Sequence, residues 1–183
     1  MCRAGSRVLV AVGFCVLLAG AAVAQPAAGL MADLAADVKD AKGKIMGLAN
    51  AMPDAAFEWR PDAAARSTKE VLAHIAADNY FIPTAAGATA PAETGIGDDF
   101  TTAAAFEKRA RTRAEVIAEL EKSFAFLEQQ MAAATEASLA TPSKWPKMTR
   151  QRLWIATATH LHEHLGQLIA YARSNKVVPP WSK

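Results

Sequence analysis

Cysteine is nearly absent from this sequence. The 183-residue chain contains two, Cys2 and Cys15, and both fall within its first 24 residues. We expect these 24 residues to be removed as a signal peptide, and the mature chain would then contain no thiol. A disulfide and a cysteine nucleophile are therefore excluded from the mature protein.

The first 24 residues have the parts of a secretory signal peptide. Arg3 and Arg7 precede an apolar run over residues 8–19, and a small-residue cleavage site ends at Ala24. A membrane anchor is the competing interpretation, but the run is short for a transmembrane helix. We therefore predict a periplasmic or secreted protein, without a stable membrane anchor after cleavage, whose single domain spans residues 25–183.

An excess of charge of one sign is also missing. The formal net charge of +2 comes from 20 basic and 18 acidic residues, and cleavage removes Arg3 and Arg7. The mature chain is then neutral, which argues against nucleic acid as a partner. Residues 107–115, "EKRARTRAE", form one basic run, but acidic residues bracket it, and we predict a solvated helix face with Arg109 and Arg113 in an exposed row.

Strand signals, phosphate-binding glycine loops and Gly-x-Ser-x-Gly motifs are lacking as well, whereas alanine-rich amphipathic segments are common. Apolar residues at spacings of three and four predict four helices that form a four-helix bundle. The second helix opens with a capping box, Ser67 to Glu70, and is expected to end at Phe81, before Pro83. The predicted helices span residues 27–51, 67–81, 103–134 and 149–174.

Residues 84–102 are rich in glycine, alanine, threonine and proline. This composition is typical of a loop, and its length makes the segment a candidate mobile lid, with a plain connection as the alternative.

Three of the four histidines lie in "THLHEHLGQ", residues 159–167. His160 and His164 are four residues apart on the apolar stripe of their helix and so face the interior together, while His162 points to solvent and Glu163 points off their face. His74 occupies the inward face of the second helix. If these two helices are neighbours, His74, His160 and His164 can converge.

Three neutral imidazoles and a water form the coordination sphere of an open zinc-like site. Zinc or nickel is favoured, with manganese or iron as alternatives. Asp78 and Gln167, each one turn from a ligand, are candidates to orient a ring or to contact a water at the metal. Histidines that only hydrogen-bond in the core are the alternative.

Two blocks of sequence carry a resemblance: "FEWRPDAAARSTKEVLAHIAADNYF" and "HLHEHLGQLIAYARSNKVVPPW". Together they resemble the DinB-like (DinB/YfiT) superfamily of metal-dependent bundle proteins over about residues 28–182. The resemblance implies a four-helix bundle with a divalent metal on His74, His160 and His164. Relatives with assigned chemistry are cytoplasmic thiol S-transferases that use bacillithiol or mycothiol and a mycothiol-dependent maleylpyruvate isomerase; the predicted export of this chain departs from them.

These observations predict an exported metal-dependent hydrolase or transferase of unknown small-molecule substrate, with thiol S-transferase chemistry as one form. The alternative is a non-catalytic binding or structural module in which a metal links two helices. A homodimer is compatible with such a bundle.

Overall fold

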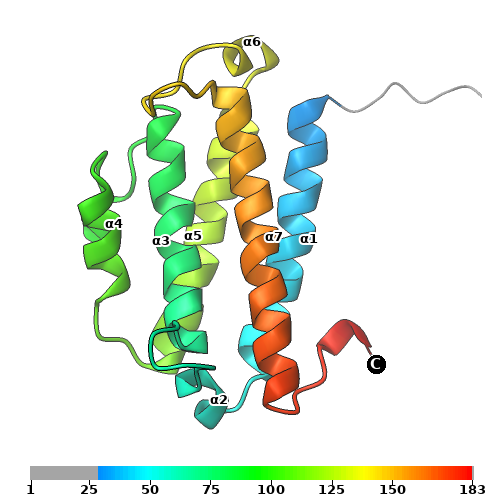
Figure 1. The fold of residues 1–183 in the computed structure, drawn as a ribbon. Helices are drawn as coiled ribbons and strands as arrows, with labels where there is room; N and C mark the ends of the chain where they lie inside the picture. Colours follow the sequence, from blue (N-terminus) through cyan, green and yellow to red (C-terminus); the bar gives the residue numbers. More distant parts are fainter. Residues whose placement is uncertain (1–28, 183) are drawn as a thin grey trace, which may run out of the picture.

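Four long helices lie side by side in the computed structural model, which describes residues 29–182 (Figure 1). The predicted signal peptide, residues 1–24, lies outside the described residues. None of the described helices has the length and apolarity needed to cross a membrane. The long helices are α1 (Leu30–Ala51), α3 (Thr68–Ala85), α5 (Arg113–Ala133) and α7 (Arg150–Ser174).

Each long helix contacts two of the others, so that the order around the bundle is α1, α5, α3, α7. Helices α3 and α5 run in the same direction, as do α1 and α7 (Figure 1). Two neighbouring parallel helices require a connection that returns along the whole bundle. Residues 86–112 make this crossover and contain η1 (Ala92–Thr94) and α4 (Phe100–Glu107).

The outer helices follow the predicted pattern closely. Helix α1 ends at Ala51, as predicted, and buries one stripe that includes Leu34, Val38 and Ile45. Helix α7 begins after Thr149, whose hydroxyl accepts a hydrogen bond from the amide of Arg152. The short helices α2 (Asp54–Glu58), α6 (Glu136–Leu139) and η2 (Pro180–Ser182) lie in segments predicted as connections or tail.

The prediction that the second helix ends at Phe81 is wrong, because α3 continues through Pro83 to Ala85. Proline removes only one hydrogen-bond donor, and packing offsets that loss here. Every residue from 71 to 85 is buried, since α4 covers the side of α3 that α5 and α7 leave open. The predicted capping box of Ser67 and Glu70 is present at the other end.

The third predicted helix, residues 103–134, is two helices. Helix α4 ends at Glu107, and α5 begins after Thr112, which forms a capping box with Glu115. The Thr-x-x-Glu pattern at 112–115 was the sequence signal for this break. Of the segment 84–102, residues 84 and 85 end α3 and residues 86–102 belong to the crossover, in which Thr94 and Ile96 are buried.

Candidate metal centre

His74 of α3 and His160 and His164 of α7 meet inside the bundle. Their ring centroids lie 4.4 to 5.3 Å apart, and each ring can offer one nitrogen to a common point, with all three nitrogens within 4.8 Å of one another. The Nε2 atoms of His160 and His164 are 3.0 Å apart. Neighbouring nitrogen ligands on a tetrahedral zinc are about 3.3 Å apart, so this arrangement fits an ion of that size.

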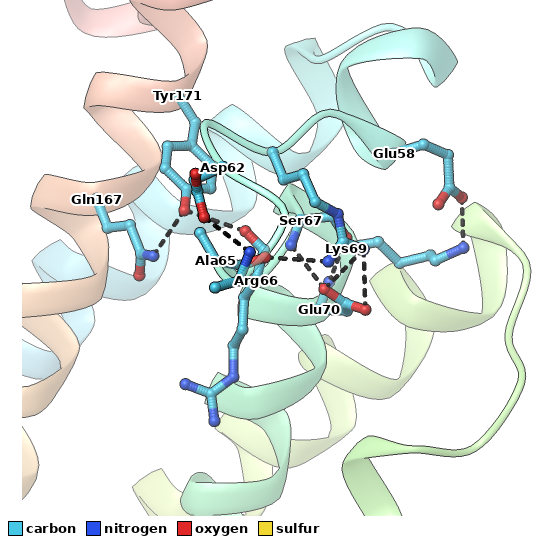
Figure 2. A network of polar contacts seen from close by, with 11 residues as sticks. Glu58, Asp62, Ala65, Arg66, Ser67, Lys69, Glu70, Gln167 and Tyr171 are labelled. Carbon is cyan, nitrogen blue, oxygen red and sulfur yellow. Dashed lines mark hydrogen bonds and ion pairs between the residues drawn. The ribbon is translucent and has the colours of Figure 1, made fainter.

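A chain of hydrogen bonds determines which nitrogen of His164 faces the cluster. Figure 2 shows Gln167 directed at the hydroxyl of Tyr171, beside the segment that carries Arg66. The Tyr171 hydroxyl donates to the Arg66 carbonyl over 3.1 Å and accepts from Gln167 Nε2 over 2.9 Å. Gln167 Oε1 is left to accept from His164 Nδ1 at 2.9 Å. His164 Nε2 therefore carries a lone pair toward the cluster.

Glu107 has the same role for His74. Its Oε1 lies 2.7 Å from His74 Nδ1, and its Oε2 accepts from the Arg66 guanidinium over 3.2 Å. A carboxylate on the outer nitrogen of a histidine is the usual support of a metal ligand. Glu107 was assigned to a solvated face in the sequence because the break after α4 was not predicted.

Asp78 lies on the inner side of the rings. Its Oδ2 is 3.3 Å from His74 Nε2 and 3.2 Å from His160 Nε2. Since it faces the same nitrogens that point into the cluster, it does not hold an outer ring nitrogen as Glu107 and Gln167 do. Of the two roles considered for Asp78, contact with a molecule inside the site agrees better with this position.

With its three rings neutral and Asp78 ionised, the cluster has fewer hydrogens than acceptors. His74 and His164 hold their ring protons on Nδ1, so their Nε2 atoms are acceptors, and Asp78 adds another. The single ring proton of neutral His160 can be donated to only one of these three acceptors at a time. A divalent cation satisfies several lone pairs at once, and the donor set therefore fits a metal ion.

Burial keeps the ring nitrogens unprotonated. It lowers the pKa of His160 to about 4, and the neighbouring His164 and His74 act in the same direction. Burial also lowers the pKa of His164, more than the hydrogen bond to Gln167 raises it. Near neutral pH, the imidazoles of His160 and His164 are thus unprotonated, which is the form that binds metal.

The two carboxylates differ in their acidity. Burial raises the pKa of Asp78 to about 6. The charge of His74 opposes this rise, and the charge of Glu107 adds to it. Burial disfavours ionised Glu107 as well, but the hydrogen bond and charge of His74, with the charge of Arg66, lower its pKa overall. Glu107 is therefore ionised near neutral pH, where Asp78 can exchange a proton.

Among the three histidines, His160 is the most exposed. The side chain of His160 is 25% exposed, against 10% for His74. His160 and Asp78 line a cleft of about 470 Å³ between α3, α7 and the crossover. A small molecule in this cleft, which we call the aromatic cleft, would lie against the cluster.

The remaining polar residues of these segments lie elsewhere. His162 is exposed, and its Nδ1 lies 2.8 Å from the Ala158 carbonyl. Glu163 is exposed at the rim of the aromatic cleft. The predicted row of Arg109 and Arg113 is not formed: Arg113 is half-buried and donates to the carbonyl groups that end α1.

The fold and cluster define an all-α protein in which two helices of a bundle hold three convergent histidines. A sequence model described as the DinB superfamily matches residues 38–168, a range that contains all three. The chain belongs to the DinB superfamily, which confirms the resemblance seen in the two sequence blocks.

A solved structure supports the same fold. The crystal structure of a DinB-like protein, YjoA of Bacillus subtilis, superposes with a TM-score of 0.64 at 16% identity, covering 82% of this chain and 98% of that chain. No curated protein matches the sequence.

Proposed function

We propose that this protein is an exported metal-dependent hydrolase or transferase that activates water or a thiol at a divalent ion held by His74, His160 and His164. The observation that carries the proposal is the convergence of three histidines from two helices, each with one ring nitrogen within 4.8 Å of the others. The open side at His160 supports a reactive site, because a substrate in the aromatic cleft can reach the ligands.

The donor set agrees with zinc or nickel, with manganese or iron as alternatives, because imidazole suits each of these ions. Such an ion supplies Lewis acidity, which makes water or a thiol a better nucleophile at neutral pH. Glu107 and Gln167 hold two of the rings so that Nε2 faces inward, and the ordered rings lose little freedom when a ligand bond forms.

Asp78 is the proton acceptor in this proposal. When water attacks, its oxygen bonds to the electrophilic carbon, one of its protons passes to Asp78 Oδ2, and the bond to the leaving group breaks. Asp78 then returns the proton to the leaving group. In thiol transfer, the thiol proton follows the same path and sulfur forms the new bond.

The first test is metal content. Residues 25–183, expressed without a histidine tag, should contain a stoichiometric divalent metal by inductively coupled plasma mass spectrometry. His160→Ala should lose it, and His162→Ala, an exposed histidine of the same helix, should keep it. A His160→Ala variant that binds metal as tightly as the unaltered chain contradicts the proposal.

A helix-linking metal site is the second candidate, because the histidines come from two helices, α3 and α7. Cobalt(II) in place of the native metal separates the two functions. A change in its visible absorption on addition of azide or a small thiol indicates an exchangeable position and supports catalysis, whereas an unchanged spectrum supports a structural site.

A bundle that binds no metal is the third candidate. Its histidines would then hydrogen-bond among themselves, with His74 between the carboxylates of Glu107 and Asp78. Absence of metal after reconstitution would support this candidate.

A further inference from the structure

We propose that the substrate carries an apolar group about the size of an aromatic ring, on a molecule that is neutral or positively charged, and that the aromatic cleft binds this group. The proposal rests on the proposed function, since it concerns the substrate of the same site. It follows from the walls of the cleft, the exposure of one of its aromatic residues and the charges at its rim.

Four large apolar side chains line the aromatic cleft. Phe81 and Ile82 come from α3, Phe100 from the first residue of α4, and Trp145 from the connection before α7. The Phe81 ring lies 5.9 Å from that of Phe100 and 5.7 Å from that of Trp145. Three aromatic rings from separate segments thus line the same cleft as His160 and Asp78. Apolar clefts of this size with a few convergent polar groups are typical of small-molecule sites.

Phe100 is not placed there by core packing. Its side chain is 61% exposed, whereas Phe106 on the same helix is 1% exposed. Helix α4 does not need Phe100 to begin, because the Asp99 carboxylate accepts the hydrogen bond of its first turn. A large apolar side chain left in water at the edge of a cleft gains favourable burial when an apolar ligand enters.

The connection that carries Trp145 is attached to the bundle on two sides. The Lys144 amide donates to the Ala85 carbonyl at the end of α3 over 2.8 Å. The Lys144 ammonium pairs with Asp98, in the crossover, over 2.7 Å. These contacts hold Trp145 beside Phe81, so the apolar wall exists before a ligand binds and little order must be created on binding.

The charges of the cleft select against anions. Asp78, Asp98 and Glu163 line it, and no lysine or arginine is found among its described lining residues. The Lys144 ammonium beside the cleft is already paired with Asp98. A carboxylate or phosphate distant from the reacting atom would therefore meet no unpaired cation among the described lining residues and would lie near Glu163. Cationic side chains gather instead around a separate pocket on the far side of Glu107, where Arg66 is already paired with that residue.

The experiment uses three hydroxamates that bind metal through the same group. On the cobalt-loaded chain, benzohydroxamate should bind roughly tenfold more tightly than acetohydroxamate, because its ring enters the apolar wall. 4-Carboxybenzohydroxamate should lose most of that gain. Phe100→Ala should remove the preference for the ring and leave acetohydroxamate binding unchanged, while Trp181→Ala, an exposed aromatic on the tail, should change neither.

A charge variant tests the second half of the proposal. Glu163→Lys should raise the affinity for 4-carboxybenzohydroxamate several-fold, and Glu121→Lys on the exposed face of α5 should not. Equal affinities for benzohydroxamate and acetohydroxamate on a metal-loaded chain overturn the proposed substrate class and leave the metal site standing.

If the chain binds no metal, the proposed function fails. Ligand binding to the metal-free protein then still tests whether the aromatic cleft takes an apolar, non-anionic group. In a heteronuclear magnetic resonance titration, benzylamine should shift the amides around Phe100 and Trp145, and benzoate should not. Absence of shifts with benzylamine overturns the proposal.

Discussion

The two flanks of the histidine cluster use their polar atoms differently. On the closed flank, Glu107 and Gln167 each accept a hydrogen bond from the outer nitrogen of one histidine. Arg66 in turn bonds Glu107, and Tyr171 bonds Gln167. On the open flank, His160 is a quarter exposed beside the aromatic cleft, and Asp78 faces the inner nitrogens. The closed flank orients the rings, and the open flank is where chemistry can take place.

Removing an inward histidine should have the largest effect on this arrangement. We expect His164→Ala to weaken metal binding by a factor on the order of a thousand, because one of three protein ligands is lost. Competition with a chromophoric chelator measures the affinity. His162→Ala is the matched control, and similar affinities for the two variants would show that His164 is not a ligand.

Asp78→Asn should show how the ionised carboxylate on the open flank lowers the free energy of unfolding. In the metal-free protein, the raised pKa of Asp78 means that the folded state binds more protons than the unfolded state between about pH 4 and pH 6. The contribution of Asp78 to stability therefore falls as pH rises through this window. Without metal, Asp78→Asn should exceed the unaltered chain in stability by up to about 3 kcal/mol at neutral pH.

Urea unfolding with a metal chelator present measures this difference. Near pH 3, the difference between the two chains should be largely lost, because Asp78 is then mostly protonated in both the folded and unfolded states. A constant difference across the window would mean that ionisation of Asp78 is not its cause.

Glu107→Ala, on the closed flank, should weaken metal binding less than the loss of a histidine does. His74 would lose the acceptor of its Nδ1 proton, and supports of this kind contribute about 10- to 100-fold to metal affinity. Glu107→Gln, which retains an acceptor oxygen, should lose less. Glu121→Ala removes an exposed carboxylate of α5 and serves as the control. An unchanged affinity in Glu107→Ala would mean that packing alone orients His74.

Tyr171→Phe should have the smallest effect. Gln167 loses the acceptor that orients its amide, and the Arg66 carbonyl loses a donor, at a cost of about 1 kcal/mol in the free energy of unfolding. Metal affinity should fall a few-fold, because the Gln167 amide can then turn and present its nitrogen to His164. Unfolding midpoints and chelator competition, each compared with His162→Ala, measure the two effects.

Much of the bundle is predictable from local patterns. The stripe of α1, the capping box at Ser67 and the span of α7 depend on spacings within a few residues. The errors lie where tertiary contacts outweigh local preference. Pro83 stays inside α3 because neighbouring helices bury it, and the third predicted helix divides at a capping box that a continuous apolar pattern obscured.

The convergence of His160 and His164 follows from the helix alone, because residues four apart lie on one face whatever surrounds them. The partners of the site do not follow from local spacing. Glu107 is 33 residues from His74, and it reaches that ring because the crossover returns beside α3. Phe100 meets Phe81 for the same reason, and Trp145 meets it because the connection before α7 is bonded to the end of α3. Spacing within a helix is fixed by backbone hydrogen bonds, whereas contacts between segments depend on how the whole chain packs.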